Sequence, residues 1–135
     1  MDNYQRFGQI AAQFYIGVGF GLIGAIITLI IADLHYNRID LFGTGMYFYI
    51  GFYIGNQVGI GFNGLRFLTK LGRRNEFYKY FGLSVIGMIL AQVITYYSFL
   101  HIANNLSIWM AYFIGLILTL GGPMLGFNIK LINTV

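Results

Sequence analysis

Two histidines and two aspartates are the ionisable residues whose types could carry chemistry. Asp33, His35 and Asp40 follow the first apolar stretch, and His101 closes the third. Imidazole and carboxylate groups together can bind a metal ion or relay a proton. Because all four lie in predicted connecting turns, we interpret them as solvated loop residues. His35 and His101 are kept as weak candidates for metal ligands, and no metal site or other cofactor is predicted.

Residue sets typical of enzymes are absent from the sequence. There is no Ser/His/Asp set, no paired catalytic carboxylates, no HExxH motif and no phosphate-binding glycine loop. The chain has no cysteine, which excludes a disulfide framework and a thiolate zinc site. Buried ionisable groups mark most proton and ion pathways in membranes, and no apolar stretch carries a charge at its middle. We therefore predict that the protein is not an enzyme, and a proton-coupled pump is disfavoured.

Side-chain amides are the main polar groups inside the apolar stretches. An amide in lipid is costly unless it bonds to another helix, a ligand or water. One interpretation is a polar cleft, and the other is a set of ties between helices. The residues concerned are Gln13, Asn56, Asn63, Gln92 and Asn128. Pro123, which follows Gly121 and Gly122, predicts a kink or break in the last stretch.

Basic residues gather between the second and third apolar stretches. They are Arg66, Lys70, Arg73 and Arg74. Such residues lie near anionic lipid headgroups and set the cytoplasmic side of a membrane protein. We interpret them first as topology signals, with docking of a lipid headgroup or a protein partner as the alternative. The formal net charge of +4 rests on so few groups that a nucleic-acid partner is not expected.

The composition requires a membrane as the main solvent. Hydrophobic residues make up 58% of the chain and charged residues 9%, whereas soluble domains carry about a quarter charged residues. Four uncharged stretches, at about 10–32, 41–65, 79–101 and 106–129, are each long enough to span a bilayer as a helix. The sequence therefore predicts an all-α integral membrane protein, a bundle of four transmembrane helices forming a single domain over residues 1–135. The basic connection places both termini on the cytoplasmic side. The membrane is either a bacterial cytoplasmic membrane or the mitochondrial inner membrane.

Small residues recur at helical spacing on every predicted span. Such stripes let helices approach closely in lipid, where apolar surface alone gives no drive to associate. They pack either this bundle or a partner chain. The glycines of these stripes that we select are Gly17, Gly21, Gly24, Gly51, Gly55, Gly59, Gly115, Gly122 and Gly126.

A duplication of two helices is a further interpretation. An offset of 65 residues aligns Gly61-Phe62-Asn63 with Gly126-Phe127-Asn128. If each half is one repeat, the halves are related by an axis along the membrane normal, and Asn63 and Asn128 occupy matching helix ends. The simpler interpretation is that Phe-Asn ends both helices at the membrane interface.

The chain resembles the small four-helix family of bacterial proteins that translocate polyprenyl-linked sugars. The residues that carry this resemblance are Asn63 with Arg66 and Asn128 with Lys130, an asparagine followed by a basic residue at two helix ends. The resemblance implies transport of a lipid-linked sugar. The chain also resembles the glycine-zippered family of mitochondrial inner-membrane translocase components and related respiratory-complex subunits. The residues for this second resemblance, which implies membership of a larger complex, are Gly17, Gly21, Gly51 and Gly55.

Two functions follow from these patterns. The leading expectation is a non-enzymatic membrane subunit that packs its glycine stripes against other transmembrane subunits, or against its own copies, among membrane lipids. The alternative is a small transporter or polyprenyl-lipid-linked sugar flippase, possible as a homo-oligomer. A lipid-modifying enzyme using His35 and His101 ranks third. A structural subunit should tolerate Asn63→Leu but not Gly55→Leu, whereas a transporter should lose flux with either change.

Overall fold

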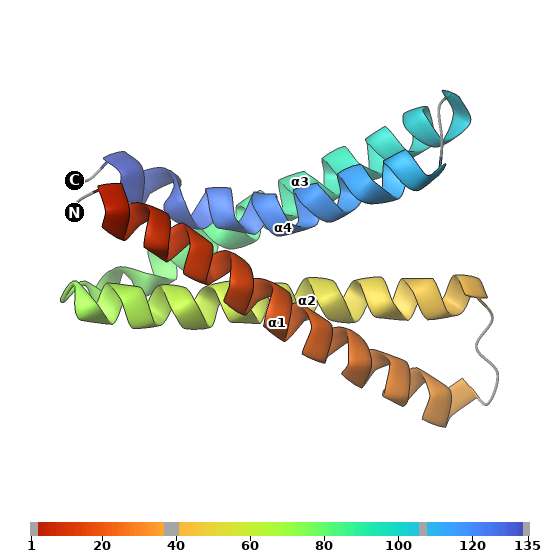
Figure 1. The fold of residues 1–135 in the computed structure, drawn as a ribbon, viewed down its shortest axis with the longest axis horizontal. Coiled ribbons are helices and arrows are strands. Elements are labelled where there is room, and N and C mark those ends of the chain that lie inside the picture. The colour runs from red at the N-terminus through yellow and green to blue at the C-terminus, as the bar shows by residue number, and fades with distance from the viewer. Residues whose placement is uncertain (1–2, 37–40, 106–107, 134–135) are drawn as a thin grey trace. The chain divides into compact units, whose positions relative to one another are not determined.

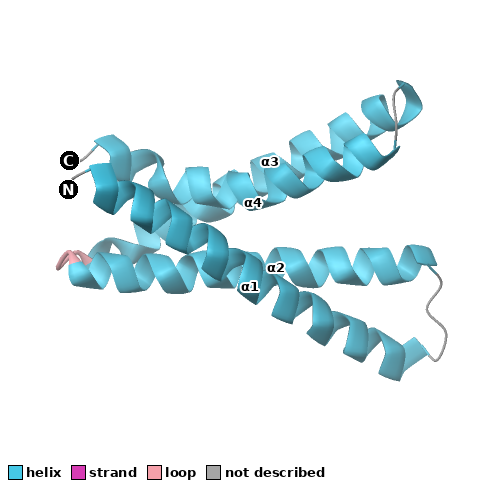
Figure 2. Cartoon of the chain, in the orientation of Figure 1, coloured by secondary structure: helices cyan, strands magenta, loops and turns pink. Residues whose placement is uncertain are grey.

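The computed structural model describes residues 3–36, 41–105 and 108–133, which form four α-helices, one short 3₁₀ helix and no strand (Figures 1 and 2). The bounds are α1 Asn3–Tyr36, α2 Leu41–Lys70, η1 Arg74–Glu76, α3 Phe77–Asn105 and α4 Ile108–Asn133. The first three predicted apolar stretches lie within α1, α2 and α3, and α4 covers the fourth from Ile108 onward, residues 106–107 being outside the described residues. Asp40 lies outside the described residues.

Three of these helices are long and apolar enough to cross a membrane. The candidate spans are Tyr4–His35 in α1, Arg74–His101 in η1 and α3, and Trp109–Leu131 in α4. The shortest of them has 23 residues, which at 1.5 Å per residue exceeds a hydrocarbon core of about 30 Å. The remaining helix, α2, has 30 residues but is rich in glycine, tyrosine and amide side chains, which lower its mean hydropathy. The chain therefore has the character of a membrane protein.

The chain divides into two compact units at the boundary between Asn63 and Gly64. We call residues up to Asn63, which form α1 and most of α2, the first hairpin. Residues from Gly64 onward, which form the last turns of α2, η1, α3 and α4, are the second hairpin. Each is described by itself.

In the first hairpin, α1 and α2 cross (Figure 1), and their backbones touch through glycine. A Cβ atom added to Gly24 would overlap the Gly51 carbonyl oxygen and lie 3.2 Å from the Gly55 Cα. One added to Gly55 would overlap the Phe20 carbonyl oxygen and lie 3.0 Å from the Gly21 Cα. Only glycine permits this approach, because any side chain would displace a neighbouring backbone.

In the second hairpin, α3 and α4 lie side by side (Figure 1) and repeat the same contact. A Cβ atom added to Gly87 would overlap the Gly122 carbonyl oxygen and lie 3.2 Å from the Gly126 Cα. One added to Gly126 would overlap the Leu83 carbonyl oxygen and lie 3.0 Å from the Ser84 Cα. The two hairpins thus share one mode of helix packing.

The equivalent residues of the two hairpins are separated by two different offsets. Gly24 corresponds to Gly87, an offset of 63, whereas Gly51 and Gly55 correspond to Gly122 and Gly126, an offset of 71. The single offset of 65 predicted from sequence does not reproduce these contacts. It fails because the second hairpin has more residues between its two contacting segments, so no uniform shift can align both helices.

The side chains that point away from these contacts are large and apolar. On α1 they include Ile23, Ile26, Ile27 and Ile30, each about half exposed, and α4 adds Leu125 and Ile129. Apolar outer faces of this kind suit a helix in a membrane. In water they would have to be buried in a core, whereas in a bilayer the lipid chains cover them.

Pro123 does not interrupt α4, which continues as one helix from Ile108 to Asn133. Of the kink or break predicted from sequence, the break is therefore absent. The proline ring is fully buried, at the position that Phe52 occupies in the first hairpin by the offset of 71. Packing around the ring stabilises the helix despite its missing backbone hydrogen bond.

Candidate polar site and basic turn

Five side-chain amides of the first hairpin are buried. They are Gln9, Gln13, Asn56, Gln57 and Asn63. On α1, Gln9, Gln13 and Gly17 are spaced four residues apart and therefore share one face. That face contacts α2, because a Cβ atom added to Gly17 would overlap the Asn56 Oδ1 atom.

The side-chain amide nitrogens of Gln9 and Asn63 have no hydrogen-bond acceptor in the described chain. Gln9 is 8% exposed and Asn63 is 5% exposed, and the amide nitrogen of each lacks a hydrogen-bond partner. A buried donor without a partner costs about 1–3 kcal/mol. Gln13 and Asn56 are also fully buried but take part in polar interactions. The first hairpin therefore contains polar groups beyond those needed to join its helices.

The second hairpin has aromatic residues at the positions where the first has a glycine and an amide. By the contact equivalence, Gly17 corresponds to Tyr80 and Asn56 to Phe127. Tyr80 and Phe127 are fully buried, and their ring centroids lie 5.9 Å apart. The same helix-packing position is thus polar in one hairpin and filled by packed rings in the other.

The other two predicted cleft residues, Gln92 and Asn128, belong to the second hairpin. Gln92 donates a hydrogen bond from Nε2 to the Thr119 hydroxyl oxygen at 3.1 Å, which joins α3 to α4. Asn128 is buried and donates from Nδ2 to the Met124 carbonyl of its own helix at 2.8 Å. Gln92 therefore acts as a tie between helices, and Asn128 satisfies its donor locally.

All nine selected glycines lie where the two helices of a hairpin meet. In the first hairpin the neighbours of Gly17, Gly21, Gly24, Gly51, Gly55 and Gly59 come from the opposite helix, and in the second the same holds for Gly115, Gly122 and Gly126. By contrast, Cβ atoms added to Gly19, Gly82 or Gly121 would meet nothing within 4 Å. A partner-binding role for the nine stays a prediction.

The basic connection between α2 and α3 is an ordered turn. Gly72 has a positive φ of 70°, its N–H donates to the Thr69 carbonyl at 3.1 Å, and the Arg73 N–H donates to the Leu68 carbonyl at 2.8 Å. This pair of bonds is a Schellman motif, which ends a helix with a left-handed residue that glycine adopts without strain.

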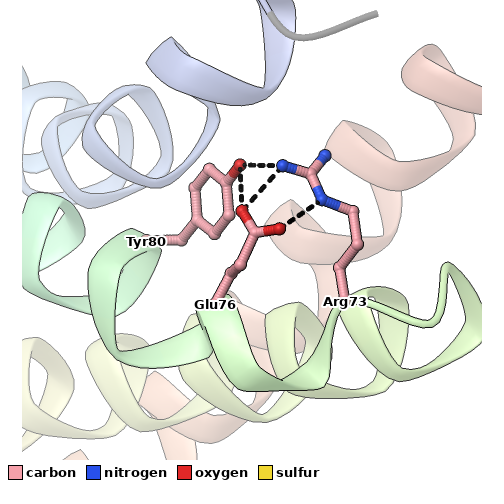
Figure 3. A network of polar contacts seen from close by, with 3 residues as sticks. All are labelled: Arg73, Glu76 and Tyr80. Atoms are coloured by element: carbon pink, nitrogen blue, oxygen red, sulfur yellow. Dashed lines mark hydrogen bonds and ion pairs between the residues drawn. The ribbon is translucent and has the colours of Figure 1, made fainter.

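Arg73 is the one member of the basic cluster held by an acid (Figure 3). Its Nε and Nη2 atoms donate to the two carboxylate oxygens of Glu76 at 2.9 and 2.7 Å. Nη2 also donates to the Tyr80 hydroxyl at 2.7 Å, and that hydroxyl lies 3.3 Å from Glu76 Oε2. The bond to Glu76 raises the pKa of Arg73, so the guanidinium stays charged.

The histidines show no sign of a metal centre in the described part of the chain. Asp33 and His35 are exposed near the end of α1, and His101 is exposed near the end of α3. Among the described residues, no group of three or more His, Cys, Asp or Glu could hold a metal ion.

Several residues that the structure makes important give little signal in the sequence. Gln9 precedes the first predicted apolar stretch by one residue. Glu76 and Tyr80 carried no motif, although their spacing of three and seven residues from Arg73 fits one helical face. Gly87 is not among the nine selected glycines, and its contact with Gly122 shows its role.

Comparisons with models of protein families, with curated proteins and with solved structures find no match.

Proposed function

We propose that the chain is a small non-enzymatic transporter that moves a lipid with an oxygen-rich headgroup across the membrane. The observation that supports this is the pair of buried, unpartnered amide donors, Gln9 and Asn63, in the hairpin that keeps polar side chains. Amide N–H groups donate to hydroxyl and phosphate oxygens, which sugars and phosphorylated headgroups supply. A buried polar group without a partner calls for an explanation in a native protein, and a role in binding is one such explanation.

The proposal includes an architecture. We infer that α2 is the fourth span, with both termini in the cytoplasm, and that the two hairpins are repeats of one ancestral unit. The shared glycine contact supports the repeat. A local motif supports it as well, since Gly19, Ile23, Gly24 and Ile26 recur at the offset of 63 as Gly82, Ile86, Gly87 and Ile89.

The test is transport of a fluorescent polyprenyl-linked sugar by purified protein in liposomes. Asn63→Leu removes an unpartnered donor while keeping a side chain of similar size, so we expect unchanged or higher thermal stability and at least a tenfold loss of flux. Gln9→Leu should have the same two effects.

Gln92→Leu is the matched control. It breaks the hydrogen bond to Thr119, so thermal stability should fall while flux per folded protein is kept. Equal flux in the wild type and Asn63→Leu would rule the proposal out.

Membership of a larger complex is the competing function. The glycines predicted to dock a partner already contact the opposite helix of their hairpin, so a partner would use the outward apolar faces. Purification in mild detergent separates the two functions. A stoichiometric set of foreign subunits would favour the complex, and a chain alone or with its own copies would favour the transporter.

A further inference from the structure

The exposed cations around the α2–α3 turn form a surface distinct from the buried amides. This turn surface consists of Arg66 and Lys70 on α2, Arg74 on η1 and Lys79 on α3. All four are exposed, and none forms a hydrogen bond or ion pair with another residue of the described chain.

The whole net charge of the protein resides at this turn. Five Lys and Arg residues and one acid, Glu76, lie between Gly64 and Gly82, which gives an excess of four positive charges. The other three basic and three acidic residues of the chain cancel. Because Glu76 neutralises Arg73, the excess is carried by the four residues of the turn surface.

The turn also lies directly at the start of a candidate membrane span. The candidate span of α3 begins at Arg74, and after Lys79 no Lys, Arg, Asp or Glu follows before its end at His101. Tyr78 beside it is 84% exposed, and an exposed aromatic residue next to cations is typical of the headgroup region. With α3 as a span, its first turns, which carry Arg74 and Lys79, would lie at the depth of lipid phosphates.

The turn is held in one conformation before any ligand binds. The Schellman motif fixes the end of α2, and the Arg73, Glu76 and Tyr80 network fixes the start of α3 (Figure 3). Tyr80 packs on Phe127, whose ring would meet a Cβ atom on Gly64. A preformed arrangement of cations loses less conformational entropy on binding than a flexible basic segment would.

We propose that the turn surface binds the phosphate headgroups of anionic phospholipids of the surrounding bilayer. The four cations have no neighbouring acid to neutralise them, because Glu76 is paired with Arg73. Their charge therefore complements two or more phosphodiester groups. Each Lys or Arg near an anionic membrane surface strengthens binding to that surface by roughly fivefold. The site is independent of the amides to which we assign transport.

The experiment measures which lipids associate with the full chain in nanodiscs of mixed phosphatidylcholine and phosphatidylglycerol. We expect the wild type to enrich phosphatidylglycerol at least about fivefold over the bulk composition, with the enrichment falling in high salt. A variant with Arg66, Lys70, Arg74 and Lys79 all changed to Gln should lose it. Arg6→Gln with Lys130→Gln, the control, should keep it.

Two further arms separate the sources of the effect. Replacing Arg66 and Arg74 by Lys keeps the charge and should keep the enrichment, which excludes an effect of altered folding. Millimolar inorganic phosphate should not displace the bound lipid. Displacement would identify a site for soluble phosphate and overturn the proposal, as would equal enrichment by the wild type and the neutralised variant. Lipid-linked sugar flux, measured in parallel, tests the transport proposal separately.

Discussion

Adding one methyl group should affect the glycines at the helix contacts differently from the other glycines. Gly24→Ala and Gly87→Ala each place a Cβ atom on a backbone carbonyl of the facing helix. We expect each change to lower the free energy of unfolding by about 1–3 kcal/mol, the usual cost of overpacking. Denaturant titration in mixed micelles measures it.

The chain supplies matched controls for that prediction. Gly19→Ala and Gly82→Ala lie on the same helices with open space around the added atom, so they should be neutral or slightly stabilising through higher helix propensity. If all four variants lose the same stability, the backbone contacts do not hold the hairpins together.

Small size and helical spacing can be read from the sequence one residue at a time. The nine glycines that they select have neighbours on the opposite helix of their hairpin, and binding of a partner by these glycines stays a prediction. The role of Glu76 could not be predicted in this way. It depends on the Schellman turn bringing Arg73 back over the start of α3, and on a Tyr80 ring buried by a residue far along the chain.

At the scale of the helix, polar bonds across each pair should contribute less than the glycine contacts. The Thr28 hydroxyl lies 2.8 Å from the Tyr47 carbonyl oxygen on the facing helix, whereas the Thr69 hydroxyl bonds to Leu65 of its own helix at 2.8 Å. We expect Thr28→Val to cost about 0.6 kcal/mol, the typical value in membranes, with about 1.7 as an upper bound.

Thr69→Val provides the comparison, because it removes no bond between helices and should leave thermal stability unchanged within the error of measurement. A loss of several kcal/mol for Thr28→Val would instead mean that polar ties, not backbone proximity, dominate the first hairpin.

The elements themselves were largely predictable, and their pairing was not. Each apolar stretch became a helix because its composition offers the backbone no other partner in lipid. Which faces meet depends on two segments far apart in sequence. An offset of 65 aligned Phe62-Asn63 with Phe127-Asn128, but the contacts align Asn56 with Phe127. In a sequence built from few residue types, identical residues at one offset indicate which positions of the two hairpins are equivalent less reliably than the helix contacts do.

At the scale of the whole molecule, the testable statement is how many times the chain crosses the bilayer. The chain has no native cysteine, so single cysteines can be labelled without background. If α2 is the fourth span, Asn75→Cys should react from the same side as Tyr4→Cys and from the opposite side to His35→Cys. A membrane-impermeant maleimide applied to intact and opened membranes measures this.

Labelling of Asn75→Cys from the side of His35→Cys would show that α2 does not cross. In that case α3 would run in the opposite direction through the membrane, and the C-terminus would lie on the side away from the N-terminus. A Lys130→Cys variant distinguishes these cases independently of the turn.

The two hairpins differ in the length of their helices beyond the glycine contact. Counted from Gly87, α3 continues six residues farther than α1 does when counted from Gly24. Likewise, α4 begins four residues farther before Gly122 than α2 begins before Gly51. At 1.5 Å per residue the second hairpin reaches about 6–9 Å farther from its contact. If both descend from one gene segment, selection kept the point of backbone contact while the helices beyond it changed in length.

Insertions near the tip of a hairpin leave the glycine contact in register, whereas an insertion between Gly51 and Gly55 would rotate the glycines out of that contact. Related chains should therefore vary in length near residues 36–41 and 105–108 and keep the four-residue glycine spacing.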